Sequence, residues 1–346
     1  MSLDTPLIPP MVYALDFSHW KKASLRSFFA GSQVRFVTQI TQVPAGSTLA
    51  VWGCRELPGL ADNITVIRLE DGFIRSVGLG ADLTRPVSWV VDRQGIYFDA
   101  TRPSDLEELL LTTAFSDDLC RRAAQLRERL VAVGLTKYNL SGRRWQRPDT
   151  DRPVILVPGQ VESDASLAYG APGIKTNMGL LQAVRAAYLD AYLIYKPHPD
   201  VLAGLRAKGR AEDQALTWCD EQITDVAMGE LLPLIDELHT MTSLTGFEAL
   251  LRGKKVTCYG QPFYCSWGLT TDLLPVARRS RRLTLDELVA GSLLLYPRYM
   301  SRTSGQLITA EQALEELLTW REQMPETATL WTRLKRTVLR LVVGVR

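Results

Sequence analysis

The sequence predicts an α/β protein with two domains, and three observations support this prediction. Its 346 residues are enough for two domains of ordinary size. Short apolar runs recur along the chain and alternate with segments whose apolar residues have helical spacing. Residues 154–200 read as strand, loop, helix, strand and loop, the pattern of a parallel βαβ unit. Polar residues follow both strands, at the sheet edge where open α/β sheets bind ligands.

Composition, cysteine spacing and the length of the apolar runs argue against several classes of protein. Hydrophobic residues make up 46% of the chain and charged residues 23%, which is ordinary for a soluble globular protein, and the net charge of +2 gives no argument for a nucleic-acid partner. The five cysteines show no C-x-x-C pair and no metal-ligand spacing, which indicates reduced thiols in the cytosol. The first ten residues do not resemble a signal peptide, and no apolar run approaches the roughly 18–20 residues of a membrane span. We therefore expect a cytoplasmic protein without a metal or other cofactor.

Residues 1–141 are expected to form an N-terminal α/β domain. A long helical region starts after Ser104 and resumes after Ser116, and each serine precedes acidic residues, as an N-cap does. Residues 142–153 are polar, contain two prolines and have no periodicity, so they are predicted to be a linker. The expected strands of this domain are residues 11–17, 34–40, 48–52, 64–69 and 87–92.

Residues 154–300 are expected to form a second α/β domain, followed by C-terminal helices in residues 301–346. Residues 330–346 combine apolar residues at helical spacing with four basic residues. This pattern predicts either a last helix that packs across both domains or a helix that lies on an anionic membrane surface. The arginine-rich residues 278–282 are likewise expected to be a solvated loop or a contact for an anionic acceptor. The expected strands are residues 154–157, 192–195, 238–241 and 255–259.

Two loops of the βαβ unit contain residues suited to chemistry. Asp164, in the loop with Glu162, could act as a base or nucleophile at an electrophilic carbon, or could simply cap a helix. Lys196 and His198 stand in a Lys-Pro-His-Pro loop, where two prolines limit the entropy lost when both side chains donate to a phosphate oxygen. A surface histidine in a turn is the alternative. We favour the functional interpretation, and expect the other two histidines, His19 and His239, to be structural.

Two further places follow predicted strands. Residues 242–248 put hydroxyl groups and unpaired backbone N–H groups at a helix N-terminus, an arrangement that suits a phosphate. Glu248, one turn into that helix, could accept hydrogen bonds from a ribose, although ordinary helix capping also explains the pattern. Glu70 and Asp71 would place a carboxylate pair at the interdomain cleft, or would form a structural turn with Gly72.

The absence of several nucleotide-binding motifs limits the classes of ligand that the protein could bind. The sequence has no P-loop, no G-x-G-x-x-G after a strand and no D-x-D between strand residues. This argues against kinases, dinucleotide oxidoreductases and many metal-dependent sugar transferases. It is compatible with a nucleoside monophosphate sugar, whose single phosphate can be neutralised by lysine, histidine and helix N–H groups.

A set of segments in fixed order also points to a family. These are LEDGFIRSVGLG (69–80), VVDRQGIYFDATRPS (90–104), KYNL (137–140), VPGQVESDAS (157–166), YKPHPDV (195–201), TSLTGFEALLRGKKVTCYGQPFY (242–264) and WGLTTD (267–272). With them the sequence resembles the bacterial capsule polysaccharide β-Kdo transferases of the KpsC type. Those enzymes often carry two transferase units in one chain, whereas this chain has one set of motifs, so the linkage it would make stays open.

The resemblance implies a GT-B-like fold, in which two Rossmann-type domains face a cleft, and CMP-Kdo as the donor. It also implies kinship with bacterial sialyltransferases, whose D/E-D/E-G and HP motifs would be Glu70-Asp71-Gly72 and His198-Pro199. Asp164 would be the catalytic carboxylate of a retaining double displacement, and His198 would stabilise the departing phosphate. The donor-binding residues would be Lys196, Ser243, Thr245, Gly246, Glu248 and Gln160, while Glu70, Asp71 and Glu162 would lie on the acceptor or sugar side.

The expected partners are CMP-Kdo, a glycolipid or oligosaccharide acceptor and the anionic surface of the inner membrane. Two alternatives remain open at this point. One is a transferase that uses CMP-sialic acid, and the other is a non-catalytic partner that binds a glycan or nucleotide sugar during capsule export.

Overall fold

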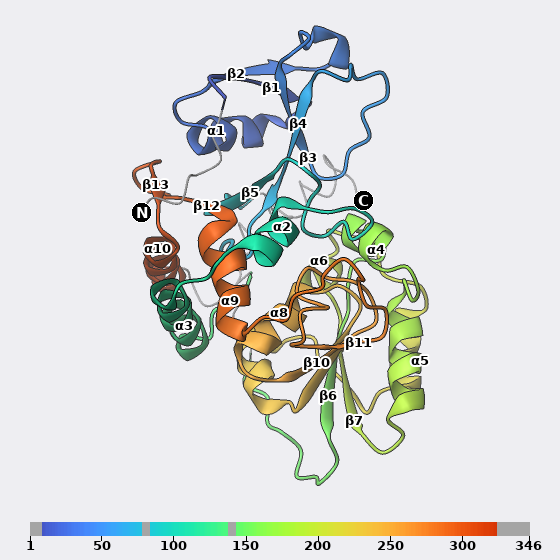
Figure 1. Cartoon of the computed structure of the whole chain (residues 1–346). Helices are drawn as coiled ribbons and strands as arrows, with labels where there is room; N and C mark the ends of the chain where they lie inside the picture. Colours follow the sequence, from blue (N-terminus) through green and yellow to red (C-terminus); the bar gives the residue numbers. More distant parts are fainter. Residues whose placement is uncertain (1–8, 78–83, 138–142, 324–346) are drawn as a thin grey trace.

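A computed structural model describes residues 9–77, 84–137 and 143–323, which form two sheet-centred halves joined by one core (Figure 1). Three predicted features lie wholly or partly outside the described residues: the ends of the LEDGFIRSVGLG and KYNL segments, and the basic helix of residues 330–346. The domain boundaries stay a prediction, but the chain is seen to return to its first sheet near residue 297.

The first half is built on a mixed seven-stranded sheet. Its strand order is β13 (Leu307–Ile308), β12 (Pro297–Met300), β5 (Ser88–Asp92), β4 (Thr65–Asp71), β3 (Thr48–Trp52), β1 (Met11–Leu15) and β2 (Gln33–Val37). The pairings among β1, β2, β3 and β4 are parallel, and those beyond β4 are antiparallel. The strands predicted from the sequence are confirmed, although several differ by a few residues at their ends.

The second half is built on a six-stranded sheet in which every pairing is parallel. Its order is β11 (Thr271–Asp272), β10 (Lys255–Cys258), β9 (Glu237–Thr240), β6 (Val154–Pro158), β7 (Tyr192–Lys196) and β8 (Glu221–Gln222). Counted from β6, this is the 3-2-1-4-5-6 order of doubly wound sheets, which bind ligands where the order reverses. The predicted βαβ unit is confirmed as β6, α5 (Asn177–Ala187) and β7.

Helices of both halves pack around the sheets. In the first half these are α1 (His19–Phe28), α2 (Asp105–Thr112) and α3 (Asp117–Ala132); in the second they are α4 (Ala165–Gly170), α5, α6 (Pro199–Leu202), α7 (Met228–Leu231) and α8 (Leu244–Leu251). The predicted caps are confirmed, because Ser104 accepts from Glu107 N at 3.1 Å and Ser116 from Leu119 N at 3.3 Å. Near the C-terminus, α9 (Leu285–Val289) and α10 (Ala310–Gln323) lie beside α3 (Figure 1).

Ion pairs to a buried glutamate join the two halves and correct one expectation in part. Arg278 and Arg279 contact the buried carboxylate of Glu107 on α2, at 2.5 and 2.8 Å. Arg281 donates to carbonyl groups at the end of α2, including that of Thr113 at 2.7 Å. Three of its four guanidinium groups are therefore engaged by the protein, whereas Ser280 and Arg282 are exposed, so the segment is solvated only in part. Such pairs resist separation, since breaking one leaves a buried charge uncompensated.

Candidate functional site

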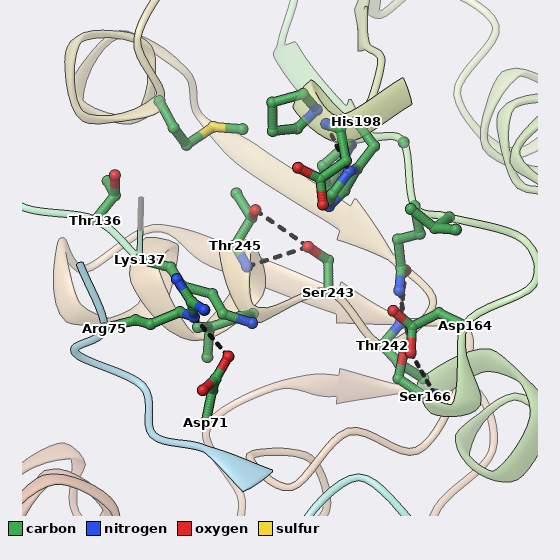
Figure 2. Close-up of a pocket in the computed structure, with 18 of the residues that line it drawn as sticks. Asp71, Arg75, Thr136, Lys137, Asp164, Ser166, His198, Thr242, Ser243 and Thr245 are labelled. Carbon is green, nitrogen blue, oxygen red and sulfur yellow. Dashed lines mark hydrogen bonds and ion pairs between the residues drawn. The ribbon is translucent and has the colours of Figure 1, made fainter. Parts of the chain in front are cut away.

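A cavity of about 580 Å³ lies between the two halves and collects the chemistry-bearing loops. It lies at the carboxyl ends of β3 and β4 in the first sheet and of β6, β7 and β9 in the second. All the predicted site residues line it except Glu162 and Gly246. Figure 2 shows Asp71 with Arg75 on one side and Asp164 on the other, with Ser243 and Thr245 between them in this view.

Asp164 combines the two roles that its sequence position allowed. It is the N-cap of α4, where its Oδ1 accepts a hydrogen bond from Ser166 N at 3.2 Å. One carboxylate oxygen is enough for this cap, and the group also lines the cavity. The cap orients the side chain in the loop between β6 and α4, so a carboxylate is held at the cavity wall.

His198 is a neutral donor rather than a cation. Its Nδ1 accepts from Asp200 N at 3.2 Å at the start of α6, so the ring proton is assigned to Nε2. Burial lowers the pKa of His198 to about 4, and the positive charge of Lys137 acts in the same direction. At neutral pH the imidazole can therefore donate one hydrogen bond without carrying charge.

Lys196 supplies the positive charge beside it. The residue is the last of β7 and is buried, and burial lowers the pKa of its ammonium to about 8 against the opposing influence of Asp225. Among the described residues, its Nζ donates no hydrogen bond to another group of the protein. A lysine with this pKa is still mostly protonated at pH 7, so at that pH its ammonium could neutralise an anion.

The N-terminus of α8 forms the wall between these groups. Ser243 is its N-cap, with the Oγ accepting from Thr245 N at 3.2 Å and donating to Thr245 Oγ1 at 3.1 Å. Glu248, one turn further on, accepts from Lys137 N at 2.7 Å, and burial raises the pKa of its carboxyl. Glu248 thus lines the cavity and also ties the segment between the halves to α8.

Gln160 lines the cavity, but its amide group is engaged by the protein. Its Nε2 donates to Thr242 Oγ1 at 2.9 Å and its Oε1 accepts from Thr242 N at 2.9 Å. The side chain therefore clamps the loop between β9 and α8. Its predicted contact with the donor stays a prediction, whereas its support of that loop is visible.

Glu162 and Gly246 do not line the cavity, but both affect the position of segments that do. Glu162 accepts from Asn177 N at 2.8 Å and from Arg210 N at 3.0 Å, so it joins two loops. A Cβ added to Gly246 would lie 2.2 Å from the hydroxyl of Tyr264, which itself donates to Ser243 O at 2.5 Å. Glycine at 246 thus allows α8 to approach Tyr264.

The first half contributes two carboxyl groups at the end of β4, and both residues are half-buried. Glu70 Oε1 accepts from Asp71 N at 3.0 Å, and burial, with the adjacent charge of Asp71, raises the pKa of Glu70 to about 7. Asp71 Oδ2 accepts from Arg75 Nε at 2.5 Å, and Arg75 is itself buried. A carboxyl with a pKa near 7 can take up a proton and release it at neutral pH.

The sequence prediction missed several lining residues of the first half. Trp20 and Lys21 open α1, and Trp52 ends β3. The ammonium of Lys21 lies 3.0 Å from the Trp52 ring centroid and 5.4 Å from that of Trp20, and burial lowers its pKa to about 8. The strand-end rule that identified Asp164 could have found Trp52. Arg75, Lys137 and Arg206 also line the cavity, but single basic residues give no distinguishing pattern.

Two further searches cover only the described residues. They contain no group of three or more His, Cys, Asp or Glu side chains placed to hold a metal ion. None of their helices combines the length and apolar character needed to cross a membrane.

Solved structures of similar proteins match nearly the whole of this architecture. The β-Kdo 2,7 transferase of Thermosulfurimonas dismutans KpsC is 42% identical, with a TM-score of 0.77 over 90% of this chain and 99% of that one. The β-Kdo 2,4 transferase of the same protein is 31% identical, with a TM-score of 0.76 over 90% of this chain and 98% of that one.

Curated relatives are longer than the matched region. The capsule polysaccharide modification protein LipA of Neisseria meningitidis is 44% identical over 318 residues, which are 89% of this chain and 45% of the relative. The lipopolysaccharide-processing protein LpsZ of Rhizobium meliloti is 37% identical over 334 residues, covering 91% of this chain and 76% of that protein. This chain therefore spans about half the length of LipA.

A family model described as capsule polysaccharide biosynthesis protein matches residues 59–139 and 121–299. These ranges contain every predicted site residue, and together they cover more than half of the chain. The chain belongs to the capsule polysaccharide biosynthesis protein family and, by its likeness to both solved transferases, to the KpsC type.

Proposed function

We propose that this chain transfers Kdo from CMP-Kdo to a saccharide or glycolipid acceptor in capsule biosynthesis, with retention of the β configuration. One observation carries the proposal: a single cavity joins Asp164, the Lys196–His198 loop and the Glu70–Asp71 pair. The 42% identity to a β-Kdo 2,7 transferase, over 99% of that chain, supports the choice of sugar and a GT-B-like fold of two Rossmann-type halves.

The second half would bind the CMP part of the donor. A phosphodiester carries one negative charge, which the ammonium of Lys196 would neutralise. The Nε2–H of His198 and the N-terminus of α8 at Ser243 and Thr245 would donate hydrogen bonds. Because these groups stabilise the charge that grows on the departing phosphate, they would act most strongly in the transition state.

The first displacement would use Asp164. One of its carboxylate oxygens attacks the anomeric carbon of Kdo, the bond from that carbon to the phosphate oxygen breaks, and CMP leaves with the electron pair. The N-cap contact with Ser166 holds the nucleophile in position during this step. The product is a glycosyl-enzyme ester, as in retaining glycosidases.

The second displacement would use Glu70. Its carboxylate takes the proton from an acceptor hydroxyl, whose oxygen attacks the same carbon and displaces Asp164. The pKa of Glu70, raised to about 7, suits a group that must accept a proton at neutral pH and release it afterwards. Two inversions at one carbon give net retention.

The first test measures CMP release from freshly generated CMP-Kdo, with and without a short Kdo-terminated glycolipid, for wild type and Asp164→Asn. Asparagine keeps an N-cap oxygen, so the fold is expected to survive while acceptor-stimulated release falls at least about 1,000-fold. Asp190→Asn is the matched control, because Asp190 is exposed and lies outside the cavity.

Each contrary outcome has a distinct meaning. Near-normal release by Asp164→Asn would refute the role of Asp164. Release from CMP-sialic acid but not from CMP-Kdo would replace the donor sugar. If the wild type releases CMP from neither donor, the proposal of a transferase would be refuted. The alternative of a glycan-binding partner in capsule export would then be favoured.

A further inference from the structure

Trp20, Lys21 and Trp52 occupy the first-half side of the cavity, and the proposed displacements use none of them. Trp20 and Lys21 belong to the first turn of α1, and Trp52 ends β3, so the adjacent parallel strands β1 and β3 bring them together. The 3.0 Å approach of Lys21 Nζ to the Trp52 ring centroid fixes this ammonium beside an aromatic face. We call these three residues the tryptophan–lysine notch.

A polar group next to the notch lacks a partner. The Oδ1 atom of Asp71 is buried and, among the described residues, has no hydrogen-bond partner, although Oδ2 is held by Arg75 at 2.5 Å. Asp71 lines the same cavity as the notch. Buried carboxylate oxygens are normally hydrogen-bonded, so this atom is suited to accept from the hydroxyl of a bound molecule.

The charge balance around Lys21 favours the binding of an anion. Lys21 is influenced by Glu70 and Asp71, which favour its charge, and by Arg75, which opposes it. Arg75 already pairs with Asp71. Burial raises the pKa of Glu70 to about 7, so its carboxyl is only partly ionised at neutral pH. The positive charge of Lys21 is therefore only partly balanced.

We propose that the tryptophan–lysine notch is the acceptor subsite, that it takes a sugar bearing a carboxylate, and that Lys21 selects this carboxylate. The indole of Trp20 would pack on the C–H face of the sugar ring, and Asp71 Oδ1 would accept from a ring hydroxyl. Lys21 would donate to the carboxylate in a charge-assisted bond. This inference rests on the proposed function, because an acceptor subsite requires a transfer reaction.

The test compares two acceptor probes that differ in one group: the allyl glycoside of Kdo and its C1 carboxamide. For the wild type, kcat/KM should be higher for the acid than for the amide. Lys21→Met should lower kcat/KM for the acid roughly ten- to hundredfold and leave little difference between the probes. Lys21→Arg should keep the preference for the acid, because it keeps the charge.

Lys22→Met is the matched control. Lys22 is the next residue of α1, but its ammonium lies 5.1 Å from the Phe36 ring and does not line the cavity. It should keep the wild-type preference for the acid. An equal loss with both probes in Lys21→Met would assign Lys21 to the donor, and a wild type that does not distinguish the probes would equally overturn the inference.

A separate measurement distinguishes failure of this inference from failure of the proposed function. If the wild type releases no CMP from CMP-Kdo, the proposed function fails. Quenching of tryptophan fluorescence by the two probes then still tests the notch directly. Binding of the acid that Lys21→Met weakens and Lys22→Met does not would support the subsite; equal binding of acid and amide would refute it.

Discussion

Loss of the proton from the ammonium of Lys196 should lower the rate of the donor reaction at alkaline pH. Burial lowers the pKa of this lysine to about 8, and only the protonated form neutralises a phosphate. Since the charged form exists below the pKa, kcat/KM for CMP-Kdo should be constant below about pH 7 and should fall as the pH rises through 8. The pH dependence of kcat/KM reports the pKa values of groups in the free enzyme.

The size of the effect follows from the fraction of lysine that remains protonated. At pH 9, one unit above its pKa, about a tenth of Lys196 carries charge, so kcat/KM should fall about tenfold for each further unit. Lys196→Met removes the charge altogether. A hydrogen bond to a charged group contributes about 1.5–3 kcal/mol, so this variant should lose roughly 10- to 150-fold at pH 7.

The decisive variant is Lys196→Arg, because a guanidinium stays protonated throughout the range of the assay. The assay is acceptor-independent CMP release at low CMP-Kdo concentration, measured from about pH 6 to 10. Lys196→Arg should remove the fall near pH 8. Lys255→Arg is the control, since Lys255 has a side chain that is 80% exposed at the start of β10, and it should keep the limb.

A limb near pH 8 that survives in Lys196→Arg would refute this reasoning. The titrating group would then be another one, and Lys21 is a candidate because burial lowers its pKa to about 8 as well. A flat profile in the wild type would show that no lysine charge is needed for the donor.

Two further predictions concern other parts of the cavity. Acceptor-dependent transfer should rise with pH through about 7 as Glu70 loses its proton. Glu70→Gln should abolish both this rise and most of the transfer. A rise that persists in the variant would show that another group titrates there. Gly246→Ala should lower the free energy of unfolding by about 1–3 kcal/mol in urea, because its Cβ would lie 2.2 Å from Tyr264 Oη; unchanged stability would show that α8 can shift.

The positions of Asp164 and His198 could be predicted because both follow parallel strands that are close in sequence. The apolar runs of β6 and β7 define those strands, and parallel strands bring their carboxyl ends to one edge of the sheet. The same reasoning placed the residues of α8. Local capping was predictable too, since Ser104 and Ser116 act on backbone groups three residues away.

Other roles could not be predicted, because they depend on contacts between distant segments. Gln160 acts on Thr242, 82 residues along the chain, and Glu107 meets Arg279 across 172 residues. No pattern within a window of sequence indicates such partners. This is why the sequence could not predict that Gln160 clamps a loop or that Arg278 and Arg279 pair with Glu107.

The two halves of the cavity divide the proposed chemistry. The second half holds Asp164, the proposed nucleophile, and Lys196, the proposed ligand of the leaving phosphate, whereas the first holds Glu70 and the tryptophan–lysine notch. Burial moves the pKa of Glu70 up to about 7 and that of Lys196 down to about 8, so both can be in their active states together only in a narrow range near pH 7.5. Donor release without acceptor should depend on the second half alone, and transfer on both. The fall near pH 8 should therefore be seen in both reactions, whereas the rise near pH 7 should be seen only in transfer. This difference would link each half to its own step.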